Sequence, residues 1–295
     1  MVIKSNYIAP QYYFKEIEQD FKDLPISLFM DYIPKANELE LNPINLLLLH
    51  EPNEFFGLHT WAYNNCNLFS GILTYNQELL DNLPNTIKFH FGLIQSQDIE
   101  YYNSFKEKNK QFELSFLCGV KNLSEGHKLR QSIYSLENQI NIPKKWYKVL
   151  DDFDLSTNVR PGYNEYTKDL SHIPDFEAPE QYGKRVLFED SMFHLAIENV
   201  KHNNWYTEKI AQAFASKTLP IYWGCPNLEE LGYDSRGIIT FDSKDELVNI
   251  LNNLTEDDYN SRLPYIEYNY QVSLKDTFKS NLAFILTQLK ELNNL

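Results

Sequence analysis

The sequence predicts an α/β protein built on parallel sheets, and three stretches of the chain support this fold class. Residues 193–224 follow the order strand, loop, helix, strand, which is the repeating unit of a parallel sheet. Residues 46–49 and 112–120 look like two further strands, each followed by polar residues. Because ligands of such proteins bind beyond the carboxyl ends of the strands, the polar residues after each strand are candidate site residues.

Residues 193–224 divide into elements by local signals. Large apolar residues occupy every second position over 193–197, as in a strand with one buried face. Thr207 is a suitable N-cap for the helix that follows, and apolar residues recur at helical spacing over 210–214. The aromatic and β-branched residues 221–223 are typical of a buried strand.

Between the first strand and the helix lie residues that suit a negatively charged ligand. The strand ends in Glu198 and Asn199, and the helix begins near Lys209. A helix N-terminus attracts anions, and the lysine adds a full positive charge. Trp205 and Tyr206 can stack on a base or a sugar, so these residue types predict a phosphate-bearing ligand such as a nucleotide. The alternative is an amphipathic helix whose Glu and Lys are merely solvated.

The letters of this stretch resemble the C-terminal signature of the alpha-1,3/1,4-fucosyltransferases. The matching residues are Glu198–Asn199, Thr207–Ile210 and Leu219–Gly224, and the likeness continues through residues 237–254. One departure lies within the motif, because the family usually has Tyr-Val where this chain has Trp205–Tyr206. By this resemblance the chain is identified as a glycosyltransferase family 10-like protein of the soluble bacterial or viral type.

The resemblance implies a GT-B-like fold, in which two Rossmann-like domains face each other across a central cleft. We expect residues 1–110 to form the acceptor-binding domain. Residues 111–295 would form the nucleotide-sugar domain, with a C-terminal amphipathic helix. The implied reaction moves fucose from GDP-fucose to a glycan hydroxyl, with inversion, without a metal and without a cofactor.

Composition and charge restrict the class of protein further. The chain has 295 residues, 43% of them hydrophobic, and a formal net charge of −14, which argues against a nucleic-acid binder and against binding to an anionic membrane surface. Three widely spaced cysteines without a CxxC pair argue against a zinc site or a disulfide framework. No apolar run approaches the ~20 residues of a membrane helix, and the first residues lack the core of a signal peptide. We therefore expect a soluble, cytoplasmic protein, with a peripheral place at a membrane left open.

The N-terminal half contains a helix and several strands by the same criteria. Apolar spacing predicts a helix over 14–24, and the leucine run 46–49, which has prolines on both sides, predicts a buried strand. Residues 66–74 and 86–91 look like the next strands. The polar and charge-dense stretch 96–110 indicates a domain boundary near its end.

The second half opens with another strand, turn and helix. Residues 112–120 alternate as a strand, and a helix with one apolar face follows a polar turn. In the resembling family an arginine at the start of this helix grips the donor diphosphate, and Arg130 lies where that arginine is expected. The alternative is a surface arginine. Residues 146–180 look like an irregular loop, and helical spacing after residue 273 predicts a terminal helix packed on the body.

Inverting transfer from a nucleotide sugar needs a base for the acceptor hydroxyl and positive charge for the departing diphosphate. Asp151–Asp154 contains a D-x-D string, but it lies in the irregular stretch, and the signature indicates a metal-independent enzyme. Lys209 and Arg130 would then supply the charge. The other donor-binding residues that the resemblance implies are Glu198, Asn199, Trp205, Tyr206, Thr207 and Glu208.

The base has to come from the first domain. The family's base is a glutamate just after a buried strand, and the resemblance assigns this role to Glu51 in the segment Leu49–Pro52. Glu54 and His50 are the rivals. Two alternative functions also stay open: the same fold using another nucleotide sugar, or a non-catalytic module that binds a glycan or a nucleotide.

Overall fold

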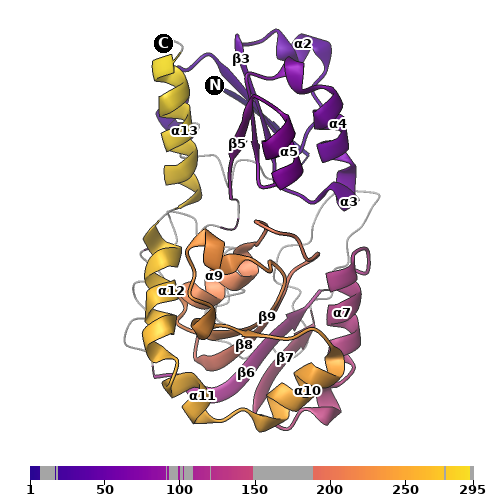
Figure 1. Ribbon diagram of the computed structural model, residues 1–295, viewed down its shortest axis with the longest axis vertical. Helices are drawn as coiled ribbons and strands as arrows, with labels where there is room; N and C mark the ends of the chain where they lie inside the picture. Colours follow the sequence, from indigo (N-terminus) through magenta and orange to yellow (C-terminus); the bar gives the residue numbers. More distant parts are fainter. Residues whose placement is uncertain are drawn as a thin grey trace. The chain divides into compact units, whose positions relative to one another are not determined.

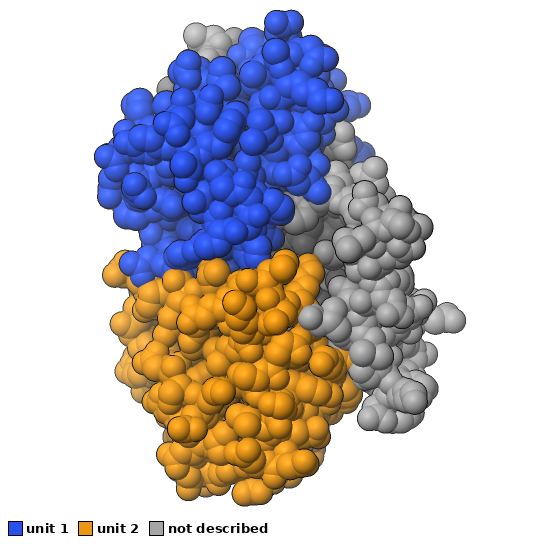
Figure 2. Space-filling view, turned by 90° about the vertical axis from the view of Figure 1, so that its right-hand side faces the viewer, with its two compact units in different colours: residues 1–98, 202–206, 276–295 blue, residues 99–201, 207–275 orange. Residues whose placement is uncertain are grey.

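The computed structural model describes residues 1–6, 17, 19–90, 92, 99, 102, 109–119, 121–148, 189–275 and 277–292. The chain divides into two compact units, coloured separately in Figure 2. Unit 1 comprises Met1–Asp98, His202–Tyr206 and Asp276–Leu295, and unit 2 comprises Ile99–Lys201 and Thr207–Lys275. No helix within the described ranges is both long and apolar enough to cross a membrane.

Unit 1 is built on a five-stranded parallel sheet with the strand order β1-β2-β3-β4-β5. The strands are β1 (Val2–Ser5), β2 (Ile26–Met30), β3 (Ile44–Leu49), β4 (Gly71–Thr74) and β5 (Thr86–Lys88). The helices are α2 (Ala36–Leu39), α3 (Asn53–Phe56), α4 (Leu58–Asn64), α5 (Gln77–Asn82) and α13 (Phe278–Leu292), with a 3-10 turn at Cys66–Leu68.

Both faces of this sheet are covered, and this explains the unbroken apolar runs of β2 and β3. Leu46 and Leu48 join a core cluster with Phe278 and Leu282 of α13, whereas Leu47 faces the other way. The opposite cluster contains residues of α4 and α5, and Figure 1 shows these helices and α13 on opposite sides of the strands. The helices between β2 and β5 thus cover one face, and α13 returns from the end of the chain to cover the other.

Unit 2 is built on a second five-stranded parallel sheet, with the order β10-β9-β8-β6-β7. The strands are β6 (Gln111–Cys118), β7 (Lys144–Lys148), β8 (Ser191–Ile197), β9 (Leu219–Trp223) and β10 (Ile239–Thr240). The helices are α7 (Glu125–Tyr134), α9 (Glu208–Ala215), α10 (Lys244–Asn253), α11 (Glu256–Asn260) and α12 (Leu263–Lys275), with 3-10 turns at Glu137–Gln139, Leu228–Leu231 and Ser235–Gly237.

In unit 2 the connections that follow β6 and β8 run toward opposite edges of the sheet. From β6 the chain runs through α7 to β7, and from β8 it runs through α9 to β9 on the other side of the sheet order. α9 packs on α12, whereas α7 contributes Ile133 to the core cluster that also holds Leu247 of α10 (Figure 1). Such a point of reversal between neighbouring strands is where open α/β sheets bind ligands.

Most sequence-predicted elements agree with the structure. The α/β class is confirmed, and so are the strand, helix and strand within residues 193–224. Within 66–74 only Gly71–Thr74 forms a strand, because Cys66–Leu68 turns as a 3-10 helix. Most of the helix predicted over 14–24, and of the loop predicted over 146–180, lies outside the described residues.

The chain divides differently from the predicted domains 1–110 and 111–295. The segment after residue 273 holds the end of α12 and then α13, and α13 belongs to unit 1. The physical reason is packing, since Phe278, Leu282, Ile285 and Leu286 are buried in the core of the first sheet. Sequence periodicity shows that a helix has an apolar face, but not which sheet that face covers.

This packing predicts unequal effects of two truncations on α13. Leu282 is fully buried, so Leu282→Ala should lower the free energy of unfolding by about 2–4 kcal/mol. Phe284 on the same helix is 66% exposed, and Phe284→Ala should change it by no more than about 0.5 kcal/mol. Urea unfolding of both variants measures the difference, and equal small effects would show that α13 does not complete this core.

Candidate functional site

Two helices begin at the carboxyl edge of the neighbouring strands β6 and β8. Ser124 caps α7, with its hydroxyl accepting a hydrogen bond from the His127 amide at 3.3 Å. Thr207 caps α9 in the same way through the Lys209 amide at 3.4 Å. Because the remaining amides of each first turn have no partner within their helix, both ends favour a negatively charged ligand.

The carboxylate of Glu198 ties β8 to the start of α9. Glu198 is fully buried, and its Oε1 accepts from the Thr207 amide at 2.8 Å, while its Oε2 accepts from the Thr207 hydroxyl at 2.7 Å. The Tyr222 hydroxyl lies 3.5 Å from Oε1, and Lys209 Nζ lies 3.7 Å from Oε2. Burial raises the pKa of Glu198, and the nearby Lys209 charge and the Thr207 hydrogen bonds counteract this effect. Glu198 is therefore engaged with protein groups and fixes where α9 begins.

Two glycines allow the chain to pack closely around Glu198. A Cβ on Gly126, in the first turn of α7, would lie 1.7 Å from the Glu198 carbonyl oxygen. A Cβ on Gly224 would lie 2.4 Å from both the Glu198 Cγ and the Tyr222 hydroxyl. Gly126 also donates its amide to the Asn199 carbonyl at 2.9 Å, so the start of α7 is joined to the end of β8.

Arg130 is anchored on the same strand end. Its buried guanidinium donates to the carbonyls of Ile197 and Glu198, the latter at 3.2 Å, and to the Asn199 side chain at 2.8 Å. Burial lowers the pKa of Arg130, and the negative charge of Glu198 acts in the opposite direction. The structure thus brings Arg130, Glu198 and Asn199 together, as the resemblance implied.

Lys209 is the more accessible of the two predicted cations. Its side chain is 27% exposed, and its Nζ lies 3.0 Å from the Thr207 hydroxyl and 3.4 Å from Glu208. The Glu208 side chain is 43% exposed. Lys209 and Glu208 therefore offer a charged donor and a charged acceptor side by side at the start of α9.

Sequence reasoning did not assign a role to His127, which lies among the cations. Burial and the charges of Arg130, Lys121 and Lys209 together lower the pKa of His127 to about 4. Its Nδ1 accepts from the Ser124 amide at 3.2 Å, as part of the cap of α7. Lys121 and His127 bracket the polar turn after β6, so the density of basic residues in that turn is the signal that could have indicated them.

The other predicted residues lie in unit 1. Glu51 follows β3 and is half-buried, and Glu54 pairs with His202 at 2.8 Å. Trp205 and Tyr206 are buried and are grouped with unit 1, where the Trp205 indole donates to the His50 carbonyl at 3.0 Å. That Trp205 and Tyr206 border a nucleotide base stays a prediction.

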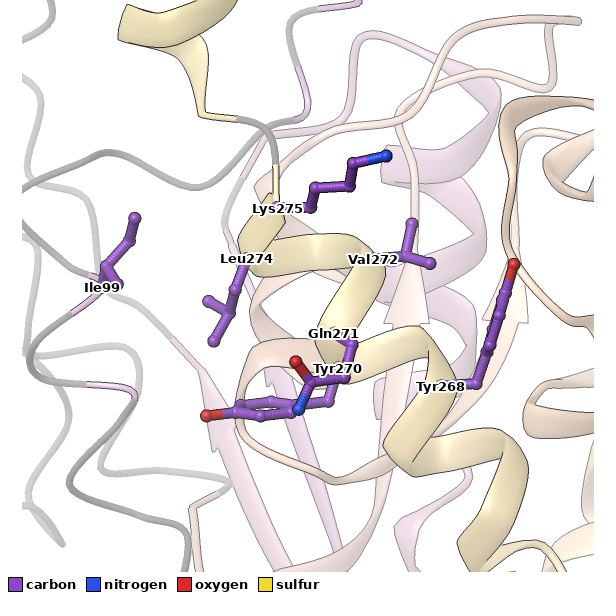
Figure 3. A pocket seen from close by; sticks show the side chains of 7 residues that line it. All are labelled: Ile99, Tyr268, Tyr270, Gln271, Val272, Leu274 and Lys275. Carbon is purple, nitrogen blue, oxygen red and sulfur yellow. The ribbon is translucent and has the colours of Figure 1, made fainter.

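Two further features bear on the site. The Asp151–Asp154 string lies outside the described residues. A hollow of about 610 Å³ along α12, shown in Figure 3, is lined by Ile99, Tyr268, Tyr270, Gln271, Val272, Leu274 and Lys275. None of the predicted site residues lines this hollow, and among its described lining residues Lys275 is the single charged one, so the convergence at β6 and β8 is the stronger candidate.

A comparison with protein-family models matches the C-terminal part of the chain. Residues 172–292 match the family model described as "Glycosyltransferase family 10 (fucosyltransferase) C-term". This stretch includes Glu198, Asn199 and residues 205–209 but not Arg130 or Glu51. The sequence comparison with curated proteins gives no match.

Solved structures share the fold across both units. An alpha1,3-fucosyltransferase matches with a TM-score of 0.52 and 14% identity, over 95% of this chain and 91% of that chain. An alpha1,3-fucosyltransferase structure with GDP-fucose matches with a TM-score of 0.51 and 16% identity, over 97% and 89%. TarM matches with a TM-score of 0.50 and 11% identity, over 94% and 57%.

The two parallel sheets and these matches show that the chain has the GT-B fold of the matched structures. The family model matches the stretch that contains the start of α9, so for residues 172–292 the comparison confirms the resemblance to glycosyltransferase family 10 noted in the sequence.

The charges around His127 predict that binding of an anion takes up a proton. At pH 7 the His127 imidazole is neutral, because its pKa is about 4. Inorganic pyrophosphate would offset the charges of Arg130, Lys121 and Lys209, so the pKa of His127 should rise in the complex. Proton uptake is then expected between pH 4 and the raised pKa, measured by calorimetry in buffers of different ionisation enthalpy.

His127→Gln is the matched variant, because Gln at this position preserves a side-chain partner for the cap of α7. It should take up fewer protons than the parent chain when pyrophosphate binds. Identical uptake by both proteins would contradict a role for His127 in this titration.

Proposed function

We propose that this family-10-like glycosyltransferase transfers fucose from GDP-fucose to a hydroxyl group of a glycan, with inversion at the sugar. The observation that carries the proposal is the gathering of Arg130, Lys209 and two helix N-termini around the carboxyl ends of β6 and β8. The matched alpha1,3-fucosyltransferase structure with GDP-fucose supports this choice of donor.

In this proposal unit 2 holds the nucleotide sugar. Negative charge builds up on the diphosphate as its bond to the sugar breaks, and fixed positive charges stabilise it. Lys209 is accessible to a ligand, and the N-terminus of α9 adds its positive end, whereas the Gly126 and His127 amides of α7 already bind Asn199 and Ser124. These groups would do the work for which other glycosyltransferases use a metal ion, so we propose a metal-independent reaction.

The remaining donor-side residues divide into two roles. Glu208 would accept hydrogen bonds from ribose or sugar hydroxyls, since its carboxylate is partly exposed beside Lys209. Glu198 and Asn199 would act through their neighbours, because the first fixes Thr207 and the second binds the Arg130 guanidinium. The Trp205 indole donates to the His50 carbonyl, and the Tyr206 ring stacks on the His90 ring, both in unit 1. We therefore do not propose that these two residues contact the nucleotide base.

In unit 1 we propose Glu51 as the base. The acceptor hydroxyl oxygen attacks the anomeric carbon, the bond to the diphosphate breaks, and the hydroxyl proton passes to the Glu51 carboxylate. Glu51 follows the carboxyl end of β3, where α/β proteins keep reactive groups. Its rivals already have ionisable partners, since Glu54 lies 2.8 Å from His202 and His50 lies 3.5 Å from Asp31.

The donor can be tested by ligand-induced stabilisation. GDP and GDP-fucose should raise the Tm of the protein, whereas UDP should leave it unchanged. Lys209→Gln removes one charge-assisted contact and should weaken GDP binding about 10- to 100-fold. Lys128→Gln, an exposed position on α7, serves as the control and should bind GDP as the parent chain does. Stabilisation by UDP-sugars alone would replace GDP-fucose with another donor in the same fold.

The base can be tested by turnover. Glu51→Gln should lower kcat by about 10²- to 10⁴-fold and leave the GDP Kd unchanged, because general base catalysis contributes about that factor. Glu78→Gln, an exposed carboxylate on α5, is the control. Unchanged turnover of Glu51→Gln, with a loss in Glu54→Gln or His50→Gln instead, would move the base to that residue. Loss of turnover in none of the three would show that the base is another residue, whereas a parent chain that binds GDP without any turnover would be a non-catalytic binding module.

A further inference from the structure

Side chains bind every backbone polar group of the dipeptide His50–Glu51. The Asp31 carboxylate accepts from the His50 amide at 2.8 Å and from the Glu51 amide at 3.2 Å. The Trp205 indole donates to the His50 carbonyl at 3.0 Å, and His59 Nε2 lies 2.9 Å from the Glu51 carbonyl. Strand β3 ends at Leu49, so these groups lie beyond its pairing with neighbouring strands. Loops at a protein surface usually leave such groups to water.

Asp31 holds an unusual backbone conformation to reach this position. It follows β2, is fully buried and has a φ of 45°, in the left-handed region that non-glycine residues seldom adopt. Its own amide donates to the Leu48 carbonyl at 2.9 Å, which extends the pairing of β2 with β3 by one bond. The strained residue thus directs its carboxylate across the end of the neighbouring strand, and such strain is typical of functional sites.

His59 is fixed in one protonation form. A carbonyl oxygen can only accept, so Nε2 carries the proton that is donated to Glu51. Nδ1 then accepts from the Asn76 side-chain amide at 3.0 Å, and the Asn76 oxygen accepts from the Leu79 amide as the cap of α5. Burial lowers the pKa of His59, which keeps the imidazole neutral in this arrangement.

Trp205 comes from the loop between β8 and α9, four residues before Lys209. Its side chain is buried and its ring lies 6.2 Å from the Tyr75 ring in unit 1. The same loop is joined to unit 1 at two further points: His202 pairs with Glu54, and the Asn204 carbonyl lies 3.2 Å from His90 Nδ1. The loop before α9 is therefore held by several contacts, and one of them, from Trp205 to His50, lies next to the proposed base.

From these contacts we infer that Trp205 is a positioning residue for Glu51, which it holds in place together with Asp31 and His59. The indole would assist proton transfer from the acceptor only by holding Glu51 in place, and it would not bind the nucleotide base. This inference rests on the proposed function, in which Glu51 takes the proton of the acceptor hydroxyl. Displacing a base from its working position by about 1 Å can cost about 100-fold in rate, so one lost bond to its backbone should be measurable.

The test is Trp205→Phe, which keeps an aromatic ring but removes the indole N–H. We expect kcat to fall about 10-fold, while the Kd for GDP stays within about twofold of the parent value. A residue that borders the nucleotide base would instead raise the Kd for GDP and leave kcat in place, and that result would overturn the inference. So would an unchanged kcat.

Trp146→Phe is the matched control. Trp146 lies on β7 in unit 2, and its indole donates to the Tyr134 carbonyl at 3.1 Å. It removes the same kind of bond from a tryptophan without a proposed role, and it should leave kcat and the GDP Kd unchanged. An equal loss of kcat in both variants would show a general effect of losing such a bond, which overturns the inference.

A double variant separates the inference from the proposed function. If Trp205 acts through Glu51, Trp205→Phe should have no further effect on kcat in the Glu51→Gln chain. A further 10-fold loss there would overturn the inference even though Glu51→Gln alone still identifies the base. Full turnover of Glu51→Gln alone would refute the base and with it the inference.

Asp31→Asn provides a second variant in case Trp205→Phe lowers the Tm strongly. Asn tolerates the left-handed backbone well, and it keeps one oxygen for the His50 and Glu51 amides but replaces the second acceptor of the Glu51 amide, 3.2 Å away, with an NH2 group. It should likewise lower kcat and leave the Kd for GDP unchanged, and a loss of GDP binding would count against the inference.

Discussion

The buried carboxylate of Glu198 forms the interactions on which the proposed donor side of this protein depends. Burying a charge is costly unless hydrogen bonds and an opposite charge compensate it, and here Thr207, Tyr222 and Lys209 do so. The same carboxylate determines where α9 begins. Gly126 and Gly224 leave room for Glu198 and its neighbours, so the starts of both helices are adjusted to one side chain.

This arrangement also explains how an acidic chain could hold the phosphate site that we propose. With a net charge of −14, the protein as a whole repels anions, so attraction has to be local. Arg130, Lys121 and Lys209 gather near His127, and they would repel one another without Glu198 and Glu208 among them. The negative residues thus keep the cluster assembled until a ligand brings its own charge.

The fold and the site were predictable from sequence to different extents. The elements of residues 193–224 were predictable because caps, prolines and apolar spacing act within a few residues. The roles of Lys209 and Arg130 come from the family resemblance and stay proposals. The destination of α13 was not predictable, since its apolar face would suit either sheet. Nor was the link from Trp205 to His50, because the two residues are far apart in sequence and no local pattern joins them.

The way the chain passes between the units has a consequence for its biosynthesis. It crosses at residues 98–99, 201–202, 206–207 and 275–276, so unit 1 contains residues made before unit 2 and residues made after it. While the ribosome is still translating the middle of the chain, the leucines on one face of the first sheet stay uncovered, because α13 has not yet been made. Nascent chains with such exposed surface are prone to aggregate and depend on chaperones. The first sheet therefore reaches its final packing only after the residues of unit 2 have been synthesised.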